Sequence, residues 1–269
     1  MIRGYLVYEE ADAKKNKSFI LMLQEEAERH GISLQLYYPG DSLTEKDVPD
    51  FVWNRSRQPA VAKYYEQLGI RVFNNSETNA LANNKKLATD FVASLNIRTI
   101  PTWTCYEQIE RYPVVVKTIN GHGGQEVVLC NNVETLQQAF SSFAKAQIII
   151  QPFIESNAQD VRVWMLGTTI LGAVLRTGAN NFKSNYTLGG SILKFDLPTE
   201  IIDAVTTIAT TLRSDYIGID FIKGKDGHFY FNEIEDPVGA RSYYELFGNN
   251  LTKKLLHYIQ SQLLRGVTI

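Results

Sequence analysis

The first 80 residues alternate short apolar runs with segments of helical periodicity. The runs at residues 5–8 and 32–38 are typical of buried strands, and residues 18–30 between them repeat apolar side chains at i, i+3 and i+4. Gly31 follows where a residue of left-handed conformation ends a helix. The pattern predicts a strand, a helix and a second strand joined as one βαβ unit.

A second round of the same pattern follows. Residues 51–53 and 71–73 are apolar runs, and residues 59–68 form an amphipathic segment that Gly69 closes. Together these elements predict a small parallel sheet flanked by helices. The segment lacks the G-x-G-x-x-G turn of dinucleotide sites, which argues against such a site here.

From about residue 80 the pattern becomes that of an α+β chain with antiparallel strands. Glycine turns join the strands at residues 114–117 and 127–129, and those at 161–166 and 169–175. Helices are predicted at residues 86–95, 133–144, 199–213 and 251–264. We expect an α/β domain at residues 1–80 and two α+β subdomains at residues 81–150 and 151–269, with no long linker between them.

Composition and charge exclude some partners. The 269 residues are 44% hydrophobic and 21% charged, which suits a chain with a large buried core. Lys and Arg number 27 against 29 Asp and Glu, so the net charge of −2 creates no basic field for nucleic acid or an anionic membrane. We therefore expect neither partner.

The cysteines and the hydropathy predict a cytoplasmic protein. Cys105 and Cys130 are too few for a disulfide scaffold and lack metal-ligand spacing, which favours a reducing compartment. No stretch reaches the roughly 18 apolar residues of a membrane span. The first ten residues run into a strand pattern and do not resemble a signal peptide.

The segment at residues 216–236, YIGIDFIKGKDGHFYFNEIED, carries the most chemical information. Its Asp226-Gly227 dipeptide predicts a two-residue hairpin turn, because a type I′ turn needs positive φ at both positions. A turn there predicts the cross-strand pairs Lys225 with His228, Lys223 with Tyr230, Phe221 with Asn232, and Asp220 with Glu233.

This register brings three carboxylates together. Asp220, Glu233 and Glu235 share one face of the hairpin, within roughly 5 to 7 Å. A hard divalent cation resolves the repulsion between them, and we predict Mg²⁺, with Mn²⁺ as the alternative. Both glutamates could instead be solvated on an edge strand. Apolar neighbours argue against that alternative, namely Ile217, Ile219, Phe221, Phe229 and Phe231.

A glycine-rich loop follows the strand at residues 114–117. Gly121, Gly123 and Gly124 let backbone N–H groups approach phosphate closely, and Lys117 ends an apolar run where a lysine needs an anionic partner. The loop is not a P-loop, because neither G-K-[ST] nor a helix follows it. It could be a nucleotide lid or a simple turn, and Lys117 could extend into water.

Several short motifs occur in a specific order along nearly the whole chain: NRSR, NNKKLAT, PVVVKTINGHGGQEVV, QPFI, DVRVWMLG, AVLR, NFKSNYTLGG, GIDFI and NEIED. In that order and spacing the chain resembles the ATP-grasp superfamily, in particular its RimK-like branch, which includes the ribosomal-protein glutamate ligases. The resemblance implies a Rossmann-like first domain followed by an ATP-grasp fold of two α+β subdomains that hold ATP between them.

The resemblance also implies roles for individual residues. Lys86 and Lys117 match the two lysines that contact phosphate, although Lys85 is the nearer fit to the preceding asparagines, and Arg176 and Asn185 match catalytic positions. Asp220, Glu233 and Glu235 match the magnesium ligands. The residues implied to bind the nucleotide are Lys86, Lys117, Gly121, His122, Gly123, Gly124, Gln151, Phe153, Ile154, Asp160 and Arg162.

Four positions depart from the family pattern. Glu235 replaces the usual asparagine of the metal site and adds a negative charge. Lys183 stands in place of an arginine, Leu188 in place of a basic residue, and Glu126 in place of a lid glycine. The departures concern the acceptor more than the ATP chemistry, so we expect a substrate other than that of the ribosomal enzymes.

The implied reaction is ATP-dependent formation of an amide, through an acyl phosphate, from a small-molecule or peptide carboxylate and an amine such as an amino acid. Three alternatives stay open: a thiol or hydroxyl acceptor, a kinase-like phosphotransfer, and an inactive nucleotide-binding regulator. Self-association is common among related proteins, so a homo-oligomer is possible.

Three basic residues are candidates for substrate binding. Arg55 follows the third strand, at the sheet edge where open α/β sheets bind ligands, and its forked guanidinium suits a carboxylate. Arg55 and Arg57 could equally form a solvated pair. Arg241 is a second candidate, although it could pair with Glu245 at i+4. Lys183 lies in a loop expected to meet the substrate.

Overall fold

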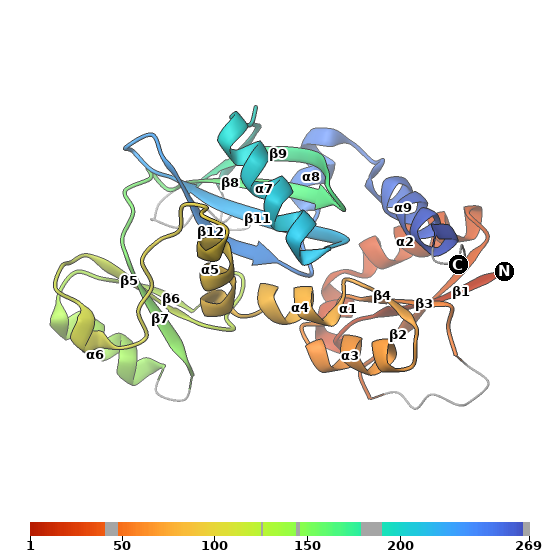
Figure 1. Ribbon diagram of the computed structural model, residues 1–269, viewed down its shortest axis with the longest axis horizontal. Coiled ribbons are helices and arrows are strands. Elements are labelled where there is room, and N and C mark those ends of the chain that lie inside the picture. The colour runs from red at the N-terminus through yellow and green to blue at the C-terminus, as the bar shows by residue number, and fades with distance from the viewer. Residues whose placement is uncertain (41–47, 125, 144–145, 179–189, 266–269) are drawn as a thin grey trace.

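The computed structural model describes residues 1–40, 48–124, 126–143, 146–178 and 190–265, which contain three β-sheets arranged in a row (Figure 1). The first sheet is parallel, with strand order β2-β1-β3-β4. Its strands are β1 (Ile2–Val7), β2 (Ile32–Tyr37), β3 (Phe51–Asn54) and β4 (Arg71–Phe73).

Helices on both faces of the first sheet agree with the predicted βαβ units. The connecting helices are α1 (Glu10–Lys15), α2 (Lys17–Arg29) and α3 (Pro59–Gln67). Just after α2 and α3, Gly31 and Gly69 have φ of +70° and +76°, a conformation that glycine adopts without a side-chain clash. The sequence signals for these two helix ends are therefore confirmed.

The C-terminal part of the chain returns to the first sheet. Helix α8 (Arg241–Phe247) precedes α9 (Leu251–Arg265), which packs beside α2 (Figure 1). Leu255 and Ile259 of α9 share one apolar core with Leu6 of β1 and Leu23 of α2. The last helix of the chain thus packs against the parallel sheet formed within residues 1–80 and contributes to its core.

Two short helices lead from the first sheet into the rest of the chain. They are α4 (Ser76–Ala82) and α5 (Lys85–Ser94), and a 3₁₀ turn, η1 (Tyr106–Gln108), follows. The Asn84 side chain accepts a hydrogen bond from the backbone N–H of Leu87 and so caps α5. The helix therefore begins at Lys85, one residue before the predicted start.

The second sheet is antiparallel, with strand order β6-β5-β7, and has its own core. It consists of β5 (Val114–Thr118), β6 (Val127–Cys130) and β7 (Ile148–Pro152), and α6 (Val133–Ser142) packs on it. A capping box at Asn132 and Thr135 begins α6. The predicted boundary between residues 150 and 151 falls inside β7.

The third sheet is antiparallel and five-stranded, with order β10-β9-β8-β11-β12. Its strands are β8 (Gln159–Leu166), β9 (Thr169–Thr177), β10 (Ser191–Lys194), β11 (Tyr216–Lys223) and β12 (Phe229–Glu235). Helix α7 (Thr199–Leu212) covers one face with a stripe of buried aliphatic side chains. The predicted α+β, antiparallel character of this half is confirmed.

Candidate active site

The hairpin of β11 and β12 turns through a wider loop than the predicted two-residue turn. The backbone N–H of Gly224 donates to the carbonyl of His228 at 2.9 Å, and Gly227 has a φ of +83°. Lys223 consequently lies opposite Phe229. The predicted pairs close to the turn are wrong by one residue, because the loop takes up more of the chain.

A β-bulge corrects this shift further along the hairpin. The register changes between Asp220 and the next residue, leaving Asn232 of β12 as the extra residue, and Asp220 then lies opposite Glu233 as predicted. The bulge therefore decides which side chains meet at the end of the two strands.

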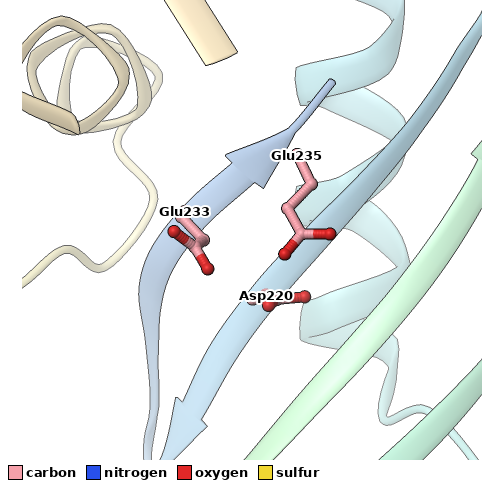
Figure 2. Close-up of side chains that lie close together, drawn as sticks. All are labelled: Asp220, Glu233 and Glu235. Carbon is pink, nitrogen blue, oxygen red and sulfur yellow. The ribbon is translucent and has the colours of Figure 1, made fainter. Parts of the chain in front are cut away.

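Three carboxylates converge at this end of the hairpin (Figure 2). Asp220 of β11 and Glu233 and Glu235 of β12 offer oxygen atoms that all lie within 4.8 Å of one another. Asp220 is fully buried, whereas the side chains of Glu233 and Glu235 are 27% and 28% exposed. The cluster thus has one buried carboxylate, Asp220, and two partly exposed carboxylates, Glu233 and Glu235.

Arginines from the neighbouring strands neutralise the buried member. Arg162 of β8 donates to the Asp220 carboxylate through Nε at 2.7 Å and Nη2 at 2.6 Å, and it also binds Glu235. Arg176 of β9 donates to Asp220 at 2.7 Å and holds Asp160 through two further bonds. Burial alone would raise the pKa of Asp220, but the two guanidinium groups outweigh it and lower the pKa.

The donor set fits a magnesium ion. All three candidate ligands are carboxylates, and Mg²⁺ prefers oxygen. Burial raises the pKa of Glu235. The charge of Arg162 lowers this pKa, whereas the charges of Asp220 and Glu233 raise it further. A divalent cation between the carboxylates would relieve this repulsion, so the residues suit the group that the sequence implies.

A cavity of about 110 Å³ lies between the second and third sheets, beside this cluster. Arg176 and Glu233 border it from the third sheet. Most of the side chains and loop positions that the resemblance implies for the nucleotide also border it, namely Lys117, Gly121, His122, Gly123, Gly124, Gln151, Phe153, Ile154 and Asp160.

Two lysines reach this cavity. Lys117 of β5 donates to the side-chain oxygen of Asn232 at 2.9 Å, and burial lowers its pKa to about 8. Lys85 of α5 lies 3.6 Å from a carboxylate oxygen of Glu233 and donates to the carbonyl of Gly121. Two ammonium groups therefore border the cavity beside the carboxylate cluster.

The structure does not bring Lys86 to the cavity. Its ammonium pairs with Asp90 one turn along the same helix, at 2.6 Å. Successive residues of an α-helix point about 100° apart, so only one of Lys85 and Lys86 can face the site. That residue is Lys85, and the signal for it was the spacing from the preceding pair of asparagines.

The glycine loop lies between two cavities. Gly123 and Gly124 have φ of +69° and +70°, and a side chain at Gly121 would collide with the hydroxyl of Thr118. His122 borders both cavities, and burial, helped by the charge of Arg57, lowers its pKa. The loop thus needs its glycines for a backbone path that residues with a Cβ rarely adopt.

A second cavity of about 310 Å³ adjoins the first. The two share six bordering residues, Lys85, Gly121, His122, Gly123, Arg176 and Glu233. The second cavity extends from the carboxylate cluster, including Arg162 and Glu235, to the first sheet and to Arg241 at the start of α8.

Arg55 borders the second cavity but is only 4% exposed. Its Nε donates to the hydroxyl of Tyr8 at 2.7 Å, and its Nη2 donates to the carbonyl of Val238 at 2.8 Å. Arg57, which also borders the cavity, is paired with Asp12 at 2.7 Å. The alternative of a solvated pair is therefore wrong, because Arg55 and Arg57 each make contacts within the described part of the protein. The role of Arg55 in substrate binding stays a prediction.

Two predicted site residues lie outside the described residues, and one site residue was missed. Asn185 and Lys183 fall in the range 179–189, which the structure does not describe. Tyr8, which borders the second cavity, was not predicted, although it directly follows the first strand at the carboxyl edge of the parallel sheet. That position was the available signal.

No helix within the described ranges is long and apolar enough to cross a membrane.

Comparisons with known proteins agree on one family. The family model for the RimK-like ATP-grasp domain matches residues 80–259. An uncharacterized protein of Mycoplasma genitalium, MG011, is 27% identical over 272 residues, which cover 97% of this chain and 93% of that protein. The alpha-aminoadipate–LysW ligase LysX of Saccharolobus solfataricus is 25% identical over 71% of this chain and 74% of its own.

Among solved structures, the D-alanine–D-alanine ligase of Bacillus anthracis complexed with ATP superposes with a TM-score of 0.72 at 17% identity, over 99% of this chain and 98% of that one. At that identity the likeness establishes the fold, which is the ATP-grasp fold. The family match spans well over half of the sequence. The chain therefore belongs to the RimK-like ATP-grasp family.

Proposed function

We propose that this protein is an ATP- and Mg²⁺-dependent ligase that joins a carboxylate to an amine through an acyl phosphate. The observation that carries the proposal is the junction of the two cavities. Arg176, Glu233 and Lys85 border both of them, so a group in one cavity can be passed to a molecule in the other. We also infer that the helix-flanked parallel sheet is the Rossmann-like domain that precedes the ATP-grasp fold.

In this proposal the first cavity takes the nucleotide. Lys85, Lys117 and the backbone of the glycine loop face the phosphates, and the segment at Phe153 and Ile154 faces the base. The ammonium groups and loop N–H donors offset the negative charge of a triphosphate. The loop then acts as a lid above the phosphate chain.

The chemistry needs positioning and positive charge more than a nucleophilic side chain. When bound at Asp220, Glu233 and Glu235, Mg²⁺ would supply further positive charge beside the phosphates. Arg176 is fixed by Asp160 and Asp220, so its guanidinium is held beside the place of transfer.

The second cavity takes the carboxylate and the amine. The carboxylate oxygen attacks the γ-phosphorus and ADP leaves, which gives the acyl phosphate. The amine then attacks the acyl carbon, the C–O bond to phosphate breaks, and the amine proton passes to solvent. The names of relatives support an amino acid as one substrate, because LysX is named for α-aminoadipate and the structural neighbour for D-alanine. We propose a small-molecule or peptide carboxylate and an amine such as an amino acid.

The test is phosphate release from ATP and Mg²⁺ in the presence of carboxylates and amines, added singly and in pairs. Release that requires both, with hydroxylamine trapping an acyl hydroxamate in place of the amide, is the expected result. Release with a thiol or hydroxyl acceptor, phosphorylation of a substrate without condensation, or nucleotide binding without turnover would each replace the proposal by the corresponding alternative.

A matched pair of variants tests the metal assignment. Glu233→Gln removes one ligand charge and should lower turnover by at least 100-fold, on the order of losing one key electrostatic group. Glu155→Gln removes a carboxylate of the same type that is 69% exposed and paired with Lys225, and it should leave turnover unchanged. Wild-type turnover by Glu233→Gln would contradict the assignment.

A further inference from the structure

His122 lies in the glycine loop at the junction of the two cavities. The residues that border both cavities are Lys85, Gly121, His122, Gly123, Arg176 and Glu233. In the proposed reaction the acyl phosphate forms at this junction, because the phosphoryl donor occupies the first cavity and the carboxylate occupies the second. An amine that attacks the acyl carbon must therefore reach the same place.

The amine has to lose a proton before it can attack. At neutral pH most amino groups are ammonium ions, and an ammonium nitrogen has no lone pair to give to the acyl carbon. The reaction is therefore helped by a group near the junction that accepts this proton. Such a base has to be unprotonated at neutral pH and not committed to a metal ion or an ion pair.

The other side chains at the junction, and the lysine beside it, do not meet these conditions. Arg176 stays protonated, and its guanidinium is bound by two aspartates. Lys85 lies 3.6 Å from Glu233, which is itself a candidate metal ligand. Lys117 donates to Asn232 and borders the first cavity but not the second. The shared glycines have no side chain to accept a proton.

The acidic side chains of the second cavity are committed to other contacts. Asp12 accepts a hydrogen bond from Arg57 at 2.7 Å. Asp236 is only 5% exposed and accepts from the Asn79 amide at 2.8 Å. Glu235 belongs to the carboxylate cluster that fits the metal. None of these carboxylates borders the first cavity, so they also lie away from the junction.

His122 meets both conditions. Partial burial lowers its pKa, and the charges of Arg57 and Lys85 lower it further. The charge of Asp12 and the backbone of Asn120 act in the opposite direction and are outweighed. The imidazole is therefore unprotonated at neutral pH, and a neutral imidazole keeps one ring nitrogen with a lone pair.

We propose that His122 is the catalytic base that takes a proton from the ammonium group of the acceptor. The imidazole nitrogen accepts the proton, and the amine keeps the electron pair with which it attacks the acyl carbon. The C–O bond to phosphate then breaks, a second proton leaves the nitrogen for solvent as the amide forms, and the imidazolium ring returns its proton to solvent. The inference rests on the proposed function and adds a residue to it.

The test compares two nucleophiles that differ in their need for a base. L-Glutamate, L-2-aminoadipate and D-alanine are the first probes, because each offers a carboxylate and an ammonium group. Hydroxylamine is the second nucleophile, because it is largely unprotonated at pH 7 and attacks an acyl phosphate without first losing a proton. Amide, hydroxamate and phosphate are measured with ATP and Mg²⁺ for the full-length wild type and for His122→Asn.

His122→Asn should form amide at pH 7 about 100-fold more slowly than the wild type, a typical contribution of a general base. Hydroxamate formation and ATP affinity should stay within about threefold of the wild type, which also shows that the variant is folded. His228→Asn is the matched control, because His228 is exposed in the hairpin turn and borders neither cavity. It should match the wild type with both nucleophiles.

The pH profile gives a second readout. Amide formation by His122→Asn should rise about tenfold per pH unit below the pKa of the amine, because only the unprotonated fraction of the amine reacts. The wild-type rate should stay nearly constant between pH 7 and pH 8. Parallel pH profiles for the wild type and His122→Asn would contradict the proposed role.

An equal loss of amide and hydroxamate in His122→Asn would overturn the inference, because it would confine His122 to nucleotide binding or phosphoryl transfer. Unchanged amide formation in His122→Asn would overturn it as well. In both cases the wild type still turns over, so the proposed function stands. If the wild type releases no phosphate from ATP with any of these carboxylates and nucleophiles, the proposed function fails and the inference fails with it.

Discussion

Replacing Lys117 by methionine should stabilise the protein and lower its affinity for nucleotide. Lys117 contacts the neutral side chain of Asn232, and burial lowers its pKa from 10.5 to about 8, while the charge of Glu233 acts in the opposite direction. Keeping this ammonium group charged inside the fold therefore costs free energy. Methionine has a similar length and no charge.

The size of the effect follows from the two pKa values. The difference between 10.5 and about 8 corresponds to roughly 3 kcal/mol at pH 7. The Lys117 side chain is partly exposed to the cavity, so solvent screens the charge, and the change also removes the bond to Asn232. We expect Lys117→Met to raise the free energy of unfolding by about 1 to 2 kcal/mol at pH 7.

The gain in stability from Lys117→Met should be largest below pH 8 and should decrease as the pH rises. A lysine whose pKa is lower in the fold than in the unfolded chain destabilises the fold fully below pH 8, and this cost disappears as the pH rises from about 8 to 10.5. Wild-type stability should thus rise relative to Lys117→Met over that interval. The affinity of the wild type for an ATP analogue should fall above pH 8, as the ammonium group loses its proton.

Urea denaturation at pH 7 and pH 10, with calorimetric binding of a non-hydrolysable ATP analogue, checks both halves of the prediction. Lys86→Met is the matched control, because Lys86 pairs with Asp90 at the surface of α5 and borders neither cavity. A Lys117→Met protein that is no more stable than the wild type at pH 7, or whose gain is the same at pH 10, would refute the reasoning.

Three further predictions concern other parts of the molecule. Lys85→Met should weaken binding of the ATP analogue at least tenfold while Lys86→Met leaves it unchanged, and equal effects in a calorimetric titration would contradict the assignment. Gly218→Ala should lower the free energy of unfolding by about 1 to 3 kcal/mol, because the new Cβ would lie 2.6 Å from Cγ2 of the buried Val238. Urea denaturation measures this loss. An unchanged urea midpoint would show that the segment at Val238 shifts to make room. Burial raises the pKa of Asp215 to about 6, so the ionised carboxylate destabilises the fold above pH 6. Asp215→Asn should therefore raise the melting temperature at pH 8 but not at pH 4. A gain in melting temperature that does not depend on pH would exclude ionisation of Asp215 as the cause.

The carboxylate cluster could be predicted because alternation along strands is a strong constraint. Asp220 and Glu233 lie opposite each other as expected, yet the turn was wrong by one residue and the bulge at Asn232 made up the difference. A bulge leaves no clear mark in a single sequence, because Asn232 has no feature that separates it from a paired residue. The agreement at the strand ends thus depended on two departures that cancel.

Other parts of the site depended on long-range packing. The helix start at Asn84 decides whether Lys85 or Lys86 faces inward, and a shift of one residue at a helix end is within ordinary uncertainty. The burial of Arg55 arises from aromatic rings contributed by distant segments, including Tyr216 of the third sheet. Such contacts join residues far apart in the chain, and periodicity within a segment cannot reveal them.

The shared apolar core has a consequence for how the molecule opens. Leu6 and Leu23 of the first sheet pack in one cluster with Trp164 of the third sheet, whereas the second sheet and α6 have a separate cluster. Two of the three sheets are therefore joined by one continuous core. We expect any motion that admits nucleotide to shift the second sheet and α6 relative to the other two sheets, while the wall that carries Tyr8 and Arg55 keeps its shape. We therefore expect the substrate side of the second cavity to be formed before nucleotide binds.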